Sequence, residues 1–312
     1  MIQLSKEEVL QNLKMKDCIS AMRQVLLDLE QGRAQQYLRT VTPLPAGGLM
    51  GYMPAAVQGM FGAKLITVFH SNMGTEYPSH QGSVLLFEEK HGSLLAMVDG
   101  GAVTQVRTGA VSAVATDLLA AKEAGVLALL GAGVQARSHL LAIQEVRTLR
   151  QVTVWDIRPE AAQNFAREMS LCTGLPITAC ATAQEAVKEA DIICTVTGSS
   201  TPVLQRAWVK PGAHINAVGA CAPKDREIDS ALMAASRVYG DSAESVLAES
   251  GDFLIPLQEG VYSQEHLLGT LGQLLAGACI GRTEPEQITL FEALGLAVED
   301  IACAKLLYQN RA

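Results

Sequence analysis

Residues 126–136 read Val-Leu-Ala-Leu-Leu-Gly-Ala-Gly-Val-Gln-Ala, an apolar run that ends in a Gly-x-Gly-x-x-Ala turn. An amphipathic stretch over residues 135–146 follows, and a second apolar run at 152–155 ends on Asp156. This order predicts a strand, a tight turn, a helix and a second strand tipped by an acid about 20 residues after the turn, which is typical of a dinucleotide-binding unit. A glycine turn that only joins a strand to a helix is the simpler alternative, and it leaves the distal acid unexplained.

Each residue type in this turn has a physical role. Gly131 allows the sharp exit from the strand, Gly133 lets a pyrophosphate approach the backbone, and Ala136 lets the helix pack closely on the sheet. The N–H groups at the helix start are expected to face the phosphates. The predicted cofactor contacts here are Gly131, Gly133, Val134, Gln135 and Ala136.

The choice between NAD(H) and NADP(H) stays open at this point. Asp156 can accept both hydroxyls of an adenosine ribose and repels a 2′-phosphate, which slightly favours NAD. Arg158, two residues further on, has the opposite effect because it can neutralise that phosphate.

Composition limits the class of protein. The chain has 312 residues, 49% of them hydrophobic, and a formal net charge of −8 with no basic stripe, so a nucleic-acid partner is not expected. No apolar run is long enough to span a bilayer, and the first residues do not resemble a signal peptide. Seven scattered cysteines without a Cys-x-x-Cys pair favour free thiols in the cytoplasm, and no metal-ligand spacing is present.

The first third of the chain predicts a domain without a nucleotide fold. Residues 5–31 have helical periodicity behind a Ser5–Glu8 capping box, and residues 104–120 predict another helix. Between them lie short strands broken by Gly and Pro, which predict a mixed or antiparallel sheet. The expected strands are 37–42, 49–53, 60–69, 83–88 and 93–98.

From about residue 121 to 240, strands and helices alternate, which predicts a parallel sheet covered by helices on both faces. The expected strands are 126–130, 152–156, 192–196, 214–218 and 237–239, and the expected helices are 134–147, 159–170, 183–189 and 229–235. Short helices are expected over 241–281. A last helix over about 289–309 is expected to return and pack on the N-terminal part.

The fold class is therefore α/β: a doubly wound Rossmann sheet plus a second, α+β domain. We place the dinucleotide-binding domain at residues 116–289. We assign residues 1–115 together with 290–312 to the second domain.

Three cations in the first third are candidates for chemistry. Lys64 interrupts an apolar strand, where it either extends to solvent or faces a cleft in which desolvation lowers its pKa. Arg39 and Arg107 could each bind a carboxylate through paired N–H donors, although an isolated arginine is more often a surface or structural residue.

Two small-residue turns end neighbouring strands of the expected parallel sheet. Ligands of such sheets bind beyond the carboxyl ends of the strands. We therefore predict that the nicotinamide is bordered by Thr195, Val196 and Thr197 on one turn and by Val218 and Gly219 on the next. Tight packing of helices on the sheet would also select small residues here.

Together these segments resemble the ornithine cyclodeaminase/mu-crystallin family nearly end to end, and 214–219 with the C-terminal helix are most similar to its mu-crystallin branch. The most specific segments are 39–43 (Arg-Thr-Val-Thr-Pro), 62–65 (Gly-Ala-Lys-Leu), 78–81 (Pro-Ser-His-Gln), 107–108 (Arg-Thr), 131–136, 209–219 and 295–300 (Gly-Leu-Ala-Val-Glu-Asp).

The resemblance implies a homodimer that acts on small amino or imino acids with NAD(P)(H). It also implies that the second domain, residues 1–115 with 290–312, binds substrate and forms the dimer. It implies that Arg39 and Arg107 hold the substrate carboxylate and that Lys64 hydrogen-bonds the reacting group and can relay a proton. Met53, Cys221 and Gly295 are expected to line the substrate pocket, with Val68 and Met73 as further candidates for its apolar wall.

One departure from the family bears on the reaction. The resemblance implies an aspartate for the substrate amine where this chain has Cys221, and a thiol with a pKa near ~8.5 is a poor partner for an ammonium group. Loss of such a catalyst typically costs ~10²–10⁴ in rate. Reduction of a preformed C=N bond does not need that acid.

We therefore expect an NAD(P)H-dependent reductase of a small cyclic ketimine carboxylate, of the 1-pyrroline-2-carboxylate type, that forms the L-imino acid. The alternatives are an ornithine cyclodeaminase, an alanine-type amino acid dehydrogenase, or a non-catalytic protein that binds NAD(P) and a small ligand.

Overall fold

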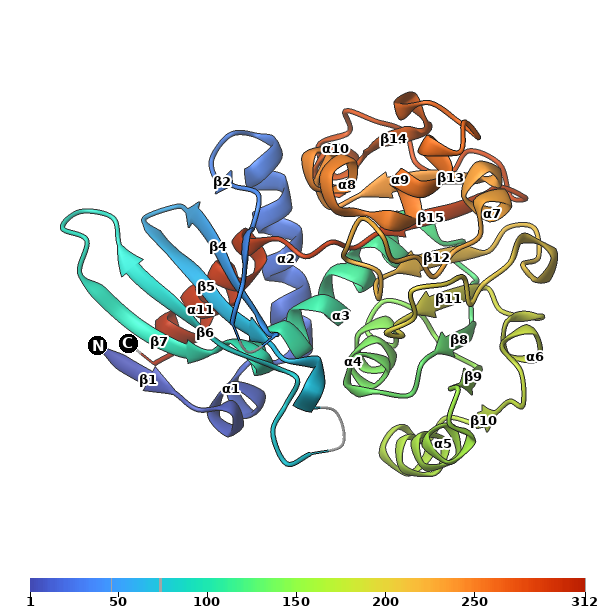
Figure 1. Cartoon of the computed structure of the whole chain (residues 1–312), viewed down its shortest axis with the longest axis horizontal. Coiled ribbons are helices and arrows are strands. Elements are labelled where there is room, and N and C mark those ends of the chain that lie inside the picture. The colour runs from blue at the N-terminus through green and yellow to red at the C-terminus, as the bar shows by residue number, and fades with distance from the viewer. Residues whose placement is uncertain (46, 73–74, 312) are drawn as a thin grey trace. The chain divides into compact units, whose positions relative to one another are not determined.

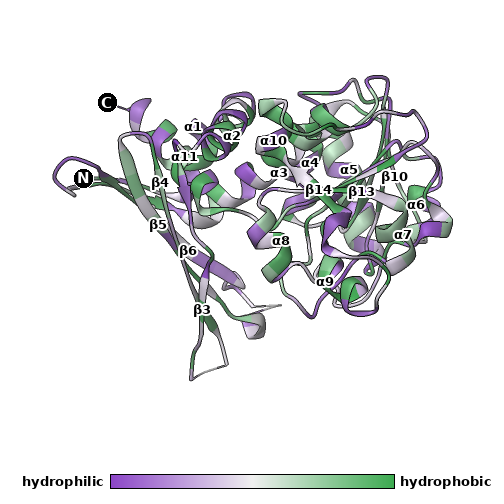
Figure 2. Ribbon diagram, turned by 90° about the horizontal axis from the view of Figure 1, so that it is seen from above, coloured by the Kyte–Doolittle hydropathy of each residue, from purple (hydrophilic) through white to green (hydrophobic). Residues whose placement is uncertain are grey.

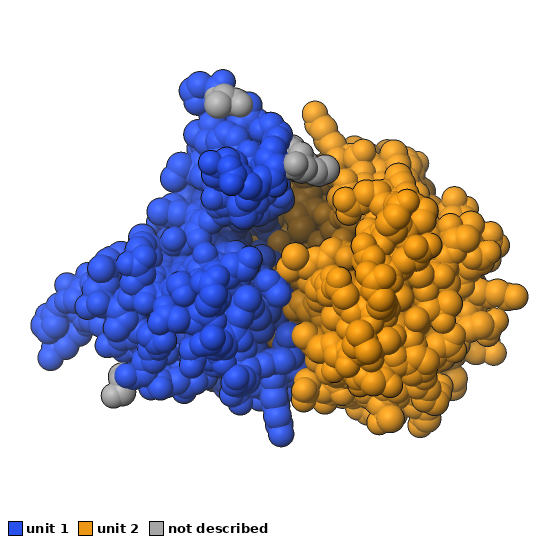
Figure 3. All heavy atoms as spheres, turned by 90° about the horizontal axis from the view of Figure 1, so that it is seen from below, with its two compact units in different colours: residues 1–107, 295–312 blue, residues 108–294 orange. Residues whose placement is uncertain are grey.

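The computed structural model describes residues 1–45, 47–72 and 75–311 and divides the chain into two units (Figures 1 and 3). Unit 1 contains residues 1–107 and 295–312, and unit 2 contains residues 108–294. The first boundary lies inside α3 (Gly100–Leu119). The sequence placed the two boundaries at 115/116 and 289/290, and the second of these falls inside a strand.

Unit 1 is a mixed sheet with helices. Its other elements are β1 (Ile2–Leu4), α1 (Lys6–Asn12), α2 (Met15–Glu30), β2 (Gln35–Gln36), β3 (Thr40–Pro43), β4 (Leu49–Val57), β5 (Met60–Val68), η1 (His70–Asn72), β6 (His80–Glu88), β7 (Leu94–Asp99) and α11 (Ala297–Gln309). The strand order is β1-β7-β6-β5-β4-β2, with β3 also paired to β4. Only β1–β7 is parallel among these pairs, which confirms the predicted mixed sheet.

The C-terminal helix packs on the N-terminal part, as predicted. α11 contacts α2 and lies against β4, β5, β6 and β7. Gly62 on β5 makes this approach close, because a Cβ there would meet Ile301 Cδ1 at 2.8 Å. Hydrophobic stretches, green in Figure 2, run along the strands of this sheet.

The predicted helix over 5–31 is two helices. The Ser5–Glu8 capping box is confirmed, since Glu8 N–H donates to Ser5 Oγ and Ser5 N–H donates to Glu8 Oε2. The first helix ends at Asn12, whose Nδ2 donates to the Glu8 carbonyl, and Leu13 leaves the helical region with ψ at 86°. A short polar side chain of this kind competes with helix continuation.

Unit 2 is an eight-stranded parallel sheet. Its elements are β8 (Val126–Leu130), α4 (Val134–Ile143), β9 (Gln151–Trp155), α5 (Pro159–Thr173), β10 (Ile177–Ala179), α6 (Ala183–Val187), β11 (Ile192–Thr195), η2 (Arg206–Trp208), β12 (His214–Ala217), α7 (Ser230–Ala235), β13 (Ser236–Gly240), α8 (Ala243–Glu249), α9 (Gly251–Gln258), η3 (Gln264–His266), β14 (Leu267–Thr270), α10 (Leu271–Ala276) and β15 (Ile288–Glu292). The strand order is β10-β9-β8-β11-β12-β15-β13-β14.

Helices cover both faces of this sheet. Leu127 and Leu129 of β8 pack in one core with residues of α4 and α5, whereas Ala128 and Leu130 pack in another with residues of α6, α7 and α9. Successive residues of a strand point to opposite faces, so the two cores lie on opposite sides of the sheet. The predicted doubly wound Rossmann sheet is confirmed.

The predicted start of the last helix at residue 289 was wrong. Residues 288–292 form β15, which lies between β12 and β13 and is buried at every position. A short apolar run does not by itself distinguish a buried strand from a helix segment. Here the pairing with β12 and β13 in the sheet makes the segment a strand. The helix starts only after Gly295, whose φ is +78°.

Candidate functional site

The turn between β8 and α4 has the shape that the sequence predicted. Gly131 N–H donates to the Trp155 carbonyl at 2.7 Å, and its φ of +105° together with a Val196 carbonyl 2.7 Å from any Cβ requires glycine. Gly133 caps α4 without a side-chain hydrogen bond, and no heavy atom lies within 4 Å of the place where its Cβ would be. Val134, Gln135 and Ala136 form the first turn of α4. Open space over an uncapped helix start fits a dinucleotide diphosphate.

Asp156 stands at the end of β9, next to this turn. Its Oδ2 accepts the Ala132 N–H and its Oδ1 accepts the Arg158 N–H, both at 2.9 Å. The Arg158 side chain is 74% exposed, with its Nε 3.5 Å from Asp156 Oδ1. The structure therefore brings both proposed selectivity residues to the edge of the glycine turn.

The turns after β11 and β12 are joined by hydrogen bonds. Val218 and Gly219 N–H donate to the Thr195 carbonyl at 3.1 and 3.2 Å, and Val196 N–H donates to the Leu130 carbonyl of β8. All five residues that the sequence placed here thus lie at the carboxyl ends of neighbouring strands.

Glu227 holds these two turns together, and it was not among the residues predicted from the sequence. Its Oε1 accepts the Thr197 N–H and hydroxyl at 2.8 and 2.5 Å, and its Oε2 accepts the Gly219 N–H at 2.8 Å. Burial raises the pKa of this carboxyl, whereas the hydrogen bonds from Thr197 and Gly219 oppose the rise. An acid a few residues beyond a small-residue turn was the only signal in the sequence.

Two further buried carboxyls support this region. Asp252 Oδ1 accepts the Glu227 and Ile228 N–H groups at 2.8 and 2.7 Å, and Glu292 Oε2 accepts the Ser250 hydroxyl at 2.9 Å. Burial, reinforced by the neighbouring Glu227 charge, raises the pKa of Asp252 to about 8. Burial and Asp252 likewise raise the pKa of Glu292.

Cys221 lies in an exposed position on the turn after β12. Its Sγ is 3.4 Å from the Val218 carbonyl and 3.9 Å from the Ala293 carbonyl that follows β15. The thiol therefore stands at the carboxyl ends of two adjacent strands of unit 2, and its place in a substrate pocket stays a prediction.

Lys64 is buried in the middle of the unit 1 sheet. On β5 it pairs with Met53 of β4 and Val84 of β6, and both neighbours are buried. Its Nζ forms an ion pair with Asp300 Oδ2 at 2.8 Å and donates to Thr104 Oγ1 at 3.2 Å. Burial lowers the pKa of Lys64 from 10.5 to about 8, against the opposing effect of Asp300. Of the two alternatives weighed for this lysine, extension to solvent is excluded.

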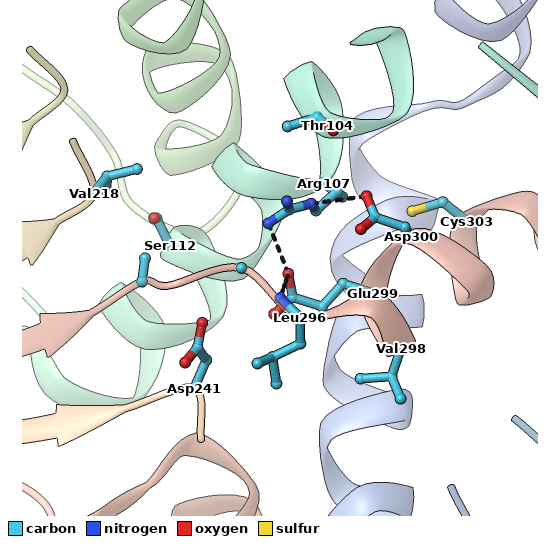
Figure 4. A network of polar contacts seen from close by, with 12 residues as sticks. Thr104, Arg107, Ser112, Val218, Asp241, Leu296, Val298, Glu299, Asp300 and Cys303 are labelled. Carbon is cyan, nitrogen blue, oxygen red and sulfur yellow. Dashed lines mark hydrogen bonds and ion pairs between the residues drawn. The ribbon is translucent and has the colours of Figure 1, made fainter. Parts of the chain in front are cut away.

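Arg107 on α3 contacts two acids of α11 (Figure 4). Its Nε donates to Asp300 Oδ1 at 3.2 Å and its Nη1 donates to Glu299 Oε2 at 2.9 Å. Burial acts to lower the pKa of Arg107, but the carboxylates of Asp300 and Glu299 outweigh it and raise that pKa. The guanidinium is therefore a permanent cation whose orientation is set by α11.

Arg39 and Gly295 complete this cluster. Arg39 Nη2 donates to the Gly295 carbonyl at 3.1 Å, and a Cβ on Gly295 would lie 2.7 Å from Arg107 Nη1. The segment 295–300 thus contacts all three predicted cations. Met53 lies beside Lys64, Val68 ends β5, and Met73 falls outside the described residues.

Glu299 and Asp300 had no role in the sequence analysis, although they belong to one of the segments that carry the family resemblance. Both are fully buried in the first turn of α11. A pair of acids inside an otherwise apolar helix was the available signal, because carboxylates are rarely buried without a cationic partner.

Within the described residues, no three His, Cys, Asp or Glu side chains are arranged to hold a metal ion. None of the helices in the same ranges combines the length and apolarity needed to cross a bilayer.

The whole chain, residues 1–312, matches the model of the ornithine cyclodeaminase/mu-crystallin family. The protein belongs to this family. It is 42% identical to ketimine reductase mu-crystallin of Mus musculus, over 98% of this chain and 96% of that protein. Two solved structures similar to this family member are a Δ(1)-pyrroline-2-carboxylate reductase from Thermococcus litoralis in complex with NADH and L-proline, and an archaeal alanine dehydrogenase dimer with bound NAD.

Both similarities extend over nearly the whole chain. The Thermococcus reductase is 38% identical with a TM-score of 0.96, covering 99% of this chain and 97% of the other. The alanine dehydrogenase is 30% identical with a TM-score of 0.95, covering 99% and 95%.

Proposed function

We propose that the chain is an NAD(P)H-dependent reductase that converts a small cyclic ketimine carboxylate, of the 1-pyrroline-2-carboxylate type, to the L-imino acid. The observation that supports this most is the buried lysine of unit 1, which lies with two arginines around residues 295–300. Relatives named ketimine reductase and pyrroline-2-carboxylate reductase support the same chemistry.

The substrate carboxylate would be bound by the arginines. Arg107 commits Nε and Nη1 to Asp300 and Glu299, so the bidentate clamp expected from sequence would have to use its remaining N–H groups. Arg39, partly exposed and fixed through Gly295, supplies the second cation. A carboxylate held by two guanidinium groups is fixed in orientation as well as neutralised.

Lys64 would supply the proton. A bound nicotinamide dinucleotide would supply a hydride to the imine carbon. The imine nitrogen takes a proton from the Lys64 ammonium before or as the hydride adds, so that no nitrogen anion forms. The neutral amine of Lys64 is then reprotonated from water. A lysine whose pKa lies at about 8 is near the operating pH, where a general acid is most effective.

The cofactor is NAD(H) or NADP(H), held at the turn between β8 and α4. We propose that NAD(H) is preferred, because Asp156 is kept at the edge of that turn by two main-chain N–H groups, while the Arg158 side chain extends into solvent.

Three alternatives are weaker. An ornithine cyclodeaminase would need an acid for the substrate amine where this chain has Cys221, and an alanine-type dehydrogenase is supported by the similarity to the archaeal enzyme. A non-catalytic binding protein would have little need of a buried lysine with a lowered pKa.

We propose that the protein is a homodimer in which two copies pair through unit 1. The face of its sheet opposite to Lys64 carries partly exposed apolar side chains on adjacent strands, namely Tyr52, Phe61, Leu65, Leu85 and Phe87. Phe61 and Phe87 stack with ring centroids 5.4 Å apart. A contiguous apolar face of this kind typically marks an interface, and twofold pairing with a second copy would cover it. Light scattering on the purified protein should give twice the chain mass.

The proposed activity is tested with a panel of cyclic imine carboxylates, 2-oxo acids with ammonia, and L-ornithine with NAD. We expect NADH and NADPH oxidation with the cyclic imines, L-proline as the product from the pyrroline substrate, and no ammonia release from ornithine. Turnover confined to ornithine or to pyruvate with ammonia would contradict the proposal.

Lys64→Met tests the role of the lysine, and Lys122→Met is the matched control because that side chain is 75% exposed. Lys64→Met is expected to lower kcat by ~10²–10⁴, the usual contribution of a general acid. Lys122→Met should keep wild-type rates. Equal rates in the two variants would exclude Lys64 as the proton source.

A further inference from the structure

Asp300 shares its carboxylate between the two buried cations of unit 1. Oδ2 lies 2.8 Å from Lys64 Nζ and Oδ1 lies 3.2 Å from Arg107 Nε, and the carboxylate is fully buried. Figure 4 shows Asp300 on α11 pointing to Arg107.

The shared contact has an electrostatic consequence. A buried carboxylate that loses its only cation is strongly destabilised, so a simple Lys–Asp pair resists loss of the lysine proton. Asp300 keeps the permanent Arg107 cation as a partner when Lys64 becomes neutral. The arrangement therefore lets Lys64 change its charge without leaving a buried acid uncompensated.

We infer that Asp300 is a positioning residue of the reduction, which fixes Lys64 Nζ and keeps the proton on it until the imine nitrogen takes that proton. This inference rests on the proposed function. The proton leaves the Lys64 N–H bond and forms the new N–H bond of the product, while Asp300 stays ionised throughout.

The groups around Lys64 act in opposite directions. Burial lowers its pKa, the Asp300 carboxylate raises it, and the cations Arg107 and Arg39 lower it. Thr104 contributes a neutral hydroxyl from α3, and Met53 and Val84 are the apolar neighbours on β4 and β6. Cys303, a thiol, is in electrostatic contact with Asp300 on the same helix. Asp300 is thus the acid that holds the proton on the lysine.

The first test measures kcat of the Asp300→Asn variant as a function of pH, with a cyclic imine and NADH as substrates. Wild-type kcat should fall above about pH 8 as Lys64 loses its proton. Removal of an adjacent opposite charge should move this alkaline limb to lower pH by about 1–3 units. The loss in kcat should therefore be large at pH 7 and small at pH 5, a pattern that general destabilisation would not produce.

Two further variants test whether the effect requires the carboxylate of Asp300 or follows from the loss of any nearby acid. Glu299→Gln removes the neighbouring acid, which contacts Arg107 at 2.9 Å; we expect a higher KM for the imine and an unmoved limb. Asp300→Glu keeps the charge and shifts its position; we expect a lower kcat with the limb near the wild-type pH.

A double-variant cycle gives a second readout if Asp300→Asn fails to fold. Asp300→Glu in a Lys64→Met background should cost little further kcat, because a residue that acts through Lys64 has no effect once Lys64 is gone. Calorimetric binding of L-proline as a function of pH gives a third readout without turnover, since the proton exchange on binding should follow the titration of Lys64.

The outcomes distinguish this inference from the proposed function. A wild-type protein that reduces no imine overturns both. If the wild type is active, three results would overturn the inference alone. They are an alkaline limb that Asp300→Asn leaves at the wild-type pH, an equal shift of that limb in Glu299→Gln, and a loss of kcat from Asp300→Glu that is as large in the Lys64→Met background as in the wild type.

Discussion

The main-chain N–H of Ala132 donates to Oδ2 of Asp156 at 2.9 Å, which ties the glycine turn after β8 to the end of β9. The acid that would bind the ribose is thus hydrogen-bonded to the turn that would hold the phosphates. One side chain therefore contributes both to cofactor selectivity and to the shape of the binding turn.

Asp156→Asn is expected to shift cofactor preference toward NADPH. The amide oxygen can still accept the Ala132 N–H, but the repulsion of a 2′-phosphate is removed, which at a near-surface separation of about 4 Å corresponds to ~1–4 kcal/mol. The ratio of kcat/KM for NADPH over NADH should rise by about tenfold or more. Arg158→Ala should lower NADPH use alone. An unchanged ratio in Asp156→Asn would contradict the assignment.

Glu227→Gln is expected to loosen the turns after β11 and β12. A glutamine offers one acceptor oxygen, so either the Thr197 or the Gly219 N–H faces an NH₂ group, and a buried unsatisfied donor costs about 1–3 kcal/mol. The Kd for NADH should rise and the Tm should fall. Glu189→Gln serves as the control, because Glu189 is exposed. Wild-type values of both quantities in Glu227→Gln would show that the hydrogen bonds to Glu227 do not stabilise these turns.

Asp252→Asn is expected to change how stability depends on pH. The folded-state pKa of about 8 lies above the unfolded value near 3.8, so the folded protein binds more protons between these values. The contribution of Asp252 to the free energy of unfolding is therefore complete below about pH 4 and decreases as the pH rises toward 8, by at most about 1.4 kcal/mol per pH unit.

The asparagine variant keeps the acceptor for the Glu227 and Ile228 N–H groups and removes the titration. Denaturant unfolding at pH 5 and pH 8 should show a smaller difference than in wild type. Asp225→Asn, which removes an acid two residues before Glu227, should keep the wild-type difference. A steeper dependence in Asp252→Asn would reverse the sign that the structure predicts.

Gly295→Ala is expected to impair substrate binding beyond any loss of stability. A φ of +78° costs a non-glycine residue about 1–2 kcal/mol, and the new Cβ would lie 2.7 Å from Arg107 Nη1, so the guanidinium must move. The KM for the imine should rise while the Kd for NADH stays constant.

Gly277→Ala is the matched control for this variant. Gly277 has a φ of +71°, but no heavy atom lies within 4 Å of its would-be Cβ. Its alanine variant should lose similar stability and keep the wild-type KM. A raised KM in both variants would indicate strain rather than contact with Arg107.

The nucleotide-binding half was predictable from sequence because its signals are local. Gly131 and Asp156 are set by the turn and by strand length, and both lie where the pattern placed them. Residues 289–292 were mistaken for helix because a short apolar run has no distinctive period. Pairing with the neighbouring strands β12 and β13 defines them as a strand.

The sequence alone determined the doubly wound sheet, the family, and the identity of Lys64, Arg39 and Arg107 as the cations to examine. Only the tertiary structure decided that Asp300 and Glu299, some two hundred residues further along the chain than Arg107, are their partners. The reason is physical: hydrophobic periodicity and turn chemistry act between near neighbours, whereas the pairing of buried charges depends on which distant segments the packing of α11 brings together.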